Sequence, residues 1–140
     1  MVERMIAFLK NCPQLETRAI NCGYLGETAG SCSLEAGKKI YEVKRYSDGA
    51  RLMRRRFILN IREEYSADIE TNLHAQKICS LIETWIKQMD RIGFLPEISG
   101  FGTATGISVL QGFRLVSAES LDAKYEAELE LEWYEESEEK

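Results

Sequence analysis

Residues that commonly carry out chemistry are few and scattered in this chain of 140 residues. The only histidine is His74, and the four cysteines are Cys12, Cys22, Cys32 and Cys79. No two cysteines have the two-residue spacing of a zinc knuckle or a redox motif. A nucleophile needs a nearby base, and His74, which follows Leu73 in a helical pattern, fits a helix surface better. We therefore predict no catalytic residue, no cofactor site, no metal site and reduced, half-buried thiols.

Charge is the chemical feature that is distributed unevenly along the chain. The net charge is −5, yet nine Lys or Arg and only two acidic residues lie between Lys38 and Arg62. Ten acidic residues and two lysines lie between Glu119 and Lys140. Alternate residues of a strand point to the same side. Two such rows result, a basic one of Arg54, Arg56 and Arg62, and an acidic one of Glu126, Glu128, Glu130 and Glu132.

Three interpretations of these rows remain open from the sequence. The rows can face solvent or pair with each other inside one sheet. They can instead meet between identical subunits, where a basic row against an acidic row fixes the register. Contact with nucleic acid is the third, although few aromatic residues interleave with the basic row and the overall charge is negative.

A glycine-rich segment, Gly100–Gly106, looks at first like a phosphate-binding loop. No Lys-Ser or Lys-Thr follows it, and it precedes a predicted strand instead of joining a strand to a helix. We therefore predict a flexible loop over residues 99–106.

The elements that position these residues follow from hydrophobic periodicity and turn signals. Ser66 or Asp68 is suited to cap the long helix, and Gly93, followed by Phe94 and Pro96, is suited to end it. Asp48-Gly49 is a hairpin signal, and Gly112 marks a bulge. We predict helices over 1–9 and 66–92 and strands over 19–26, 31–35, 39–46, 51–62, 107–115 and 124–134.

Hairpins on both sides of a long helix indicate an α+β fold. We expect a mainly antiparallel (mixed) sheet with the long helix packed on its apolar face, a short N-terminal helix, and a polar opposite face. Residues 1–134 would form a single domain and residues 135–140 an acidic disordered tail. No apolar run approaches the roughly 20 residues of a membrane helix, and Met1–Leu9 is too mixed for a signal peptide, so we expect a cytoplasmic protein without membrane contact.

The order and spacing of several segments resemble the small minor capsid proteins of Firmicutes siphophages and prophages. The segments that carry the resemblance run along nearly the whole chain: Asn21–Glu27, Val43–Gly49, Arg62–Asp68, Trp85-Ile86, Gly93–Pro96, Ile107–Leu110 and the alternating strand from Ala123 to Tyr134. This family is similar in size and layout to phage tail terminator proteins.

The resemblance implies a non-enzymatic structural virion protein, either a tail terminator or another head–tail joining component. Such a subunit assembles into a homo-oligomeric ring, expected to be hexameric, in the host bacterial cytoplasm and then remains in the virion. Its partners would be other neck and tail proteins, with transient contact to DNA passing through the ring. The alternatives are a small ligand-binding or enzymatic domain and a nucleic-acid-binding adaptor.

Overall fold

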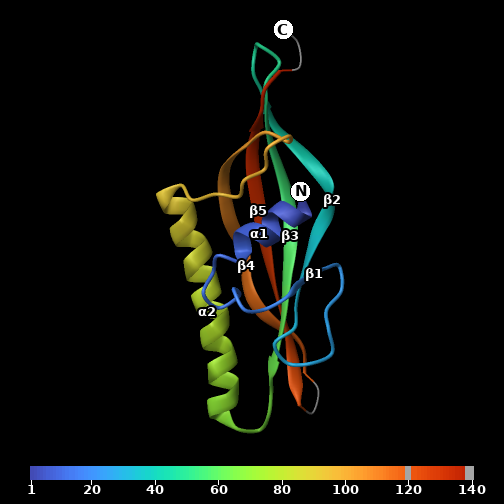
Figure 1. Cartoon of the computed structure of the whole chain (residues 1–140), viewed down its shortest axis with the longest axis vertical. Helices are drawn as coiled ribbons and strands as arrows, with labels where there is room; N and C mark the ends of the chain where they lie inside the picture. The colour runs from blue at the N-terminus through green and yellow to red at the C-terminus, as the bar shows by residue number, and fades with distance from the viewer. Residues whose placement is uncertain (119–120, 138–140) are drawn as a thin grey trace.

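A computed structural model describes residues 1–118 and 121–137 of the chain (Figure 1). Two helices and five strands follow in the order α1 (Val2–Leu9), β1 (Ile20–Cys22), β2 (Cys32–Arg45), β3 (Arg51–Glu64), α2 (Ile69–Ile92), β4 (Thr103–Ala118) and β5 (Asp122–Glu135). The strands form one sheet in the order β1-β2-β3-β5-β4. β1 is parallel to β2, and every other pair is antiparallel. The predicted α+β fold with a mixed, mainly antiparallel sheet is confirmed.

Alternation in β3 and β5 gives the sheet one apolar and one polar face. Met53, Phe57, Leu59 and Ile61 are buried, as are the residues of β5 from Ala123 to Trp133 at every second position. These side chains form one core with Met5 and Leu9 of α1 and with Ile82 and Ile86 of α2. Both helices therefore cover the same face of the sheet, and the opposite face, called the open face below, has no helix over it among the described residues (Figure 1).

The ends of α2 follow the capping chemistry predicted from its sequence. The Asp68 side chain accepts a hydrogen bond from the Glu70 backbone N–H at 3.0 Å. Gly93 takes the left-handed conformation with φ 78°, which costs glycine no Cβ strain. The Phe94 N–H then donates to the Met89 carbonyl at 2.9 Å, so the predicted end of the helix is confirmed.

The prediction of two separate strands over 31–35 and 39–46 is wrong, because β2 is continuous from Cys32 to Arg45. The register against β3 shifts between Ala36 and Ile40, so the residues around Gly37 bulge and the strand does not end there. Arg55 holds this bulge through a hydrogen bond from its Nε to the Gly37 carbonyl at 2.8 Å. That contact is between strands, which explains why the local pattern missed it.

Further predicted boundaries also change, and α2 begins at Ile69 where the prediction began at residue 66. β1 is only Ile20–Cys22, shorter than the predicted strand over 19–26. Residues 103–106 belong to β4 and pair with Trp133 and its neighbours in β5, so the loop prediction over 99–106 is wrong for its second half. Glu135 is the last residue of β5, and residues 138–140 of the predicted tail lie outside the described part of the chain.

Truncation of a central core side chain tests this arrangement. Leu129 is fully buried and pairs in register with Phe57 and Val109. We expect Leu129→Ala to lower the free energy of unfolding by about 2–5 kcal/mol through lost burial and a cavity. The matched control is Leu110→Ala at a side chain that is 44% exposed, which should change it by about 0.5 kcal/mol or less. Urea denaturation measures the free energy of unfolding of both variants. Equal losses for Leu129→Ala and Leu110→Ala would contradict the placement of Leu129 in the core.

Candidate functional site: a paired charge array on the open sheet face

The basic and acidic rows lie side by side on the open face of the sheet. β3 and β5 are neighbours, with Arg54 opposite Glu132 and Arg56 opposite Glu130. Glu128 and Glu126 lie opposite Ile58 and Asn60. The structure thus brings most of the predicted residues into one array, here called the charge ladder: Arg54 and Arg56 with Glu128, Glu130 and Glu132.

Each arginine of the charge ladder contacts two carboxylates. Arg54 Nε lies 2.9 Å from Glu132 Oε2 and 3.6 Å from Glu130 Oε1. Arg56 lies 3.5 Å from Glu128 through Nη1 and 3.7 Å from Glu130 through Nε. Glu130 is therefore shared by both arginines, which holds the charges in a fixed order along the strands.

Arg62 and Glu126 are arranged differently from the charge ladder. Arg62 donates to Asp122 Oδ1 at 2.7 Å and to the Gly26 carbonyl at 2.9 Å, and it is largely buried. It ties the 26–31 segment to the sheet. Glu126 pairs with Arg114 of β4 at 3.7 Å. Among the predicted interface residues, Arg54 and Arg56 with Glu128, Glu130 and Glu132 are therefore the ones presented together.

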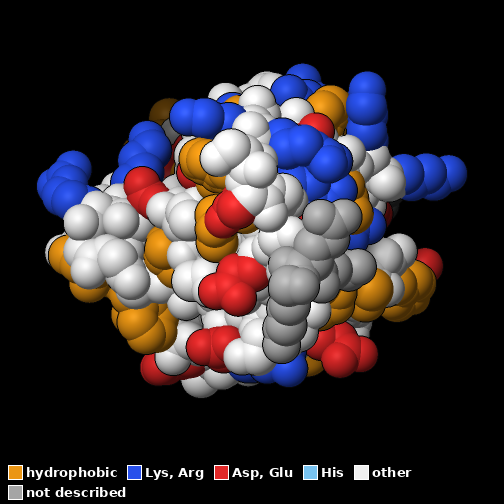
Figure 2. Space-filling view, turned by 90° about the horizontal axis from the view of Figure 1, so that it is seen from above, with side chains coloured by type: hydrophobic (Ala, Val, Ile, Leu, Met, Phe, Trp, Pro, Cys, Tyr) orange, Lys and Arg blue, Asp and Glu red, His pale blue; other side chains and the backbone are white. Residues whose placement is uncertain are grey.

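Tyr41 of β2 extends the charge ladder in a way that sequence reasoning missed. It lies opposite Arg54 in the β2–β3 register, with the Arg56 guanidinium 5.8 Å and the Lys39 ammonium 4.8 Å from its ring centre. Seen from the end of the molecule above the β2–β3 hairpin, Lys and Arg side chains gather on one side and acidic ones on another (Figure 2). The contacts of Tyr41 with Arg56 and Lys39 thus extend the charged surface of the open face from β3 and β5 to β2.

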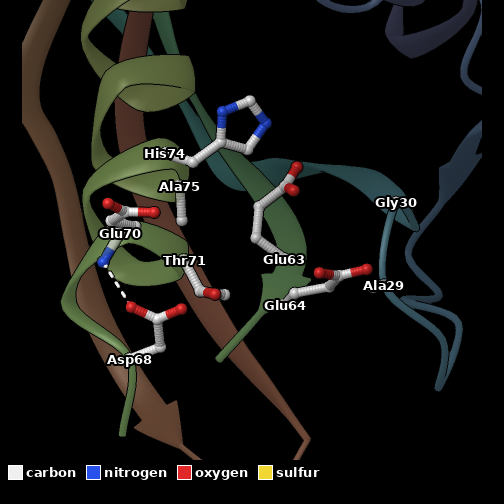
Figure 3. Close-up of a pocket in the computed structure, with 9 residues that line it drawn as sticks. All are labelled: Ala29, Gly30, Glu63, Glu64, Asp68, Glu70, Thr71, His74 and Ala75. Atoms are coloured by element: carbon white, nitrogen blue, oxygen red, sulfur yellow. Dashed lines mark hydrogen bonds between the residues drawn. The ribbon is translucent and has the colours of Figure 1, made fainter. Parts of the chain in front are cut away.

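A hollow of about 550 Å³ lies between the start of α2, the end of β3 and residues 29–30. His74 of α2 and Glu63 of β3 point toward the same space, with Glu64, Asp68 and Glu70 around them (Figure 3). Most of these side chains, His74 among them, are exposed. The hollow is therefore open to solvent, and it does not enclose its polar groups as a typical ligand pocket does.

Glu63 is the exception, since it is buried and paired with Arg18. Arg18 Nη1 forms an ion pair with Glu63 Oε1 and also approaches Cys32 Sγ at 3.9 Å. The segment between α1 and β1 brings Arg18 over the sheet, and no local pattern in the sequence predicts that meeting. The carboxylate of Glu63 serves the fold at this position.

Three of the four cysteines are buried, and their burial lowers the reactivity of the thiols. Burial raises the pKa of the Cys79 thiol to about 12 and also raises the pKa of Cys12 and of Cys32. These three thiols are therefore protonated at neutral pH and poor nucleophiles. Cys22 is exposed.

Across residues 1–118 and 121–137, no group of three or more His, Cys, Asp or Glu side chains is placed to hold a metal ion. None of the helices in this part of the chain combines the length and apolar character needed to cross a membrane. No protein-family model and no curated protein matches the chain.

The two kinds of ion pair should differ sharply in their effect on stability. Arg56→Gln removes an exposed pair and should cost about 0.2–1 kcal/mol. Arg18→Met leaves the Glu63 carboxylate buried without its cation and should cost about 3–5 kcal/mol. Urea denaturation measures both, with Arg18→Met/Glu63→Met as the control that recovers most of the loss. Similar losses for the two single variants would contradict this assignment.

Thiol accessibility gives an independent check. A native chain should show one fast-reacting thiol with a disulfide reagent at pH 8, because Cys22 alone is exposed among the four cysteines. Cys22→Ser should remove the fast phase, and denaturant should release the slow thiols. Two or more fast thiols in the native chain would be inconsistent with the burial of the other three.

Proposed function

We propose that the chain is a structural protein of a tailed phage or prophage virion, a tail terminator or another head–tail joining component. Identical copies assemble into a ring, with six as the expected number, in the host bacterial cytoplasm, and the ring becomes part of the virion. Its partners are other neck and tail proteins, and DNA passing through the ring makes transient contact with it.

The observation that carries this proposal is the charge ladder on a sheet face that no helix covers. Paired side chains are already held in place, so a partner that docks on them loses less side-chain entropy than it would on free lysines. An ordered sequence of charges also fixes the register of the docking surface. These are properties of an assembly surface, and the open hollow around His74 offers no comparable enclosure for a substrate.

The sequence resemblance to minor capsid proteins supports the same proposal. A subunit that contacts the next copy through two different surfaces generates a closed ring when the rotation closes. An α+β subunit of this size, with a broad sheet face exposed, is suited to such contacts.

Light scattering after size-exclusion chromatography tests the proposal over a range of protein and salt concentrations. At high protein concentration and low salt, we expect one oligomer whose molar mass is a whole multiple of the monomer mass. This oligomer should appear as a ring by electron microscopy. Higher salt should dissociate it, because exposed charges are screened over about 8–10 Å near physiological ionic strength. A chain that stays monomeric under every condition contradicts the proposal.

A charge-matched pair of variants separates assembly from folding. Arg54→Gln/Arg56→Gln should weaken assembly several-fold while the thermal midpoint changes little, because exposed pairs add little stability. Lys77→Gln/Lys87→Gln removes the same charge from exposed positions of α2 and should leave assembly intact. Equal effects of the two double variants would mean that net charge alone, without this face, governs association.

A further inference from the structure

The outer edge of β4 has no charged side chain and no proline of its own over most of its length. β4 lies at one end of the strand order, so no strand pairs with its outer side in the described part of the chain. Residues 103–113 contain no Lys, Arg, Asp, Glu or Pro, and the first charge is Arg114. Every second residue from Thr103 to Val109 is β-branched, which favours extended backbone. An edge strand of this composition pairs readily with strands of other chains and aggregates.

The opposite edge of the sheet carries its own protection. The part of β2 that β1 does not pair with contains Lys38, Lys39 and Lys44, and its register shifts twice against β3. Lysines and bulges both discourage pairing with a further strand. β4 also has register shifts, but over residues 103–113 it has no such charge, so its protection must come from another element.

Two carboxylates of α2 supply the charge that this edge lacks. Asp90 accepts a hydrogen bond from the Ile107 N–H at 2.9 Å. Glu83 accepts one from the Phe113 N–H at 3.2 Å. Neither carboxylate belongs to an ion pair among the described residues. Both backbone donors are therefore bound already, and an arriving strand would have to displace a carboxylate to reach either of them.

The core of the protein fixes these carboxylates beside the edge. α2 runs along the β4 side of the sheet (Figure 1), and its residues Ile82 and Ile86 are fully buried. Glu83 and Asp90 are seven residues apart, which is about two helical turns, so they lie on one side of α2. Asp90 also lines a hollow of about 260 Å³ together with Glu130 of the open face. Its carboxylate therefore lies at the rim of the sheet, where a further strand would arrive.

A glycine of β4 leaves room for one of the two carboxylates. The register against β5 passes from Gln111 to Arg114 without a partner for the residues between them. Gly112 lies in this irregular stretch, and a Cβ atom at its position would lie 1.9 Å from Glu83 Oε1. Glycine weakens a strand unless a bulge or a close approach requires it. The contact of Glu83 with the backbone is such a close approach, because any side chain at position 112 would push the carboxylate away.

We infer that Glu83 and Asp90 act as a cover for the β4 edge, which keeps the sheets of separate copies from joining through added strands. The inference stands on an uncharged, β-branched edge and on two carboxylates bound to its backbone. It does not depend on the proposed function, because a single chain needs this protection as much as a ring does. It also excludes residues 107–113 of β4 from the contacts between assembled copies.

Removal of both carboxylates tests the inference in the full chain. In Glu83→Ala/Asp90→Ala, the two capped amide hydrogens should exchange about two- to tenfold faster by NMR, because each loses its acceptor. During incubation at pH 7, below the thermal midpoint, this variant should also form thioflavin-binding aggregates several-fold faster than the unmodified chain. Glu16→Ala/Glu70→Ala removes the same charge from exposed positions and should aggregate no faster. Equal aggregation of the two double variants would overturn the inference.

A rescue experiment separates pairing at the β4 edge from a general loss of stability, which also speeds aggregation. In the Glu83→Ala/Asp90→Ala chain, Leu110→Lys places a charge on the uncovered edge at a side chain that is 44% exposed. It should slow aggregation back to the rate of the unmodified chain. Leu121→Lys makes the same change outside β4, at a side chain that is 79% exposed, and should leave aggregation fast. Rescue by both lysines, or by neither, would overturn the inference.

Gly112→Ala opens the same edge by another route. The added methyl group should displace the Glu83 carboxylate and speed amide exchange at Phe113, while Ile107 stays protected by Asp90. Alanine ordinarily stabilises a strand relative to glycine, so position 112 without the cover would predict slower aggregation. The cover predicts faster aggregation for this variant. Aggregation no faster than that of the unmodified chain would overturn the inference.

Discussion

The pairing of β3 with β5 is the constraint on which the rest of the structure depends. The two strands keep an unbroken register from Arg51 opposite Glu135 to Glu64 opposite Asp122. In this register Phe57 and Leu129 meet under the helices, while Arg56 and Glu130 meet on the open face. A slip of one residue would move arginines into the core and leucines to the solvent. The burial of one face therefore holds the charges of the other in order.

β2 and β4, on either side of the β3–β5 pair, are paired less regularly. β2 shifts register twice against β3, and β4 shifts four times against β5. Such irregularities bend strands and disturb their outer edges. The β3–β5 pair at the centre of the sheet is therefore regular, whereas β2 and β4 are bent. α2 blocks part of one edge through Asp90 and Glu83. The same helix that completes the core thus decides which part of β4 stays open.

Features set by neighbouring residues were predicted from the sequence, and features set by distant contacts were not. Alternation in β3 and β5 predicted their faces, and Gly93 predicted the end of α2, because caps and pleats act over a few residues. The start of α2 was predicted at residue 66, and the structure uses Asp68, one of the two caps considered, with the helix beginning at Ile69. The continuity of β2 past Gly37 needs Arg55 on another strand. The pair of Arg18 with Glu63 needs a crossing of the chain over the sheet. The meeting of the two charged rows was one of three open interpretations, and its role between subunits remains a prediction.

Internal pairing changes what the charged rows can contribute to assembly. Arg54 and Arg56 already have carboxylate partners within the chain. Binding of a second copy would therefore gain only the difference in free energy between the ion pairs it forms with these arginines and the ion pairs it replaces. Desolvation opposes that gain. Charge on the open face is thus better suited to selecting and orienting a neighbour than to binding it tightly. In the proposed assembly, affinity would come from groups that the single chain leaves unsatisfied, such as exposed apolar side chains of the sheet.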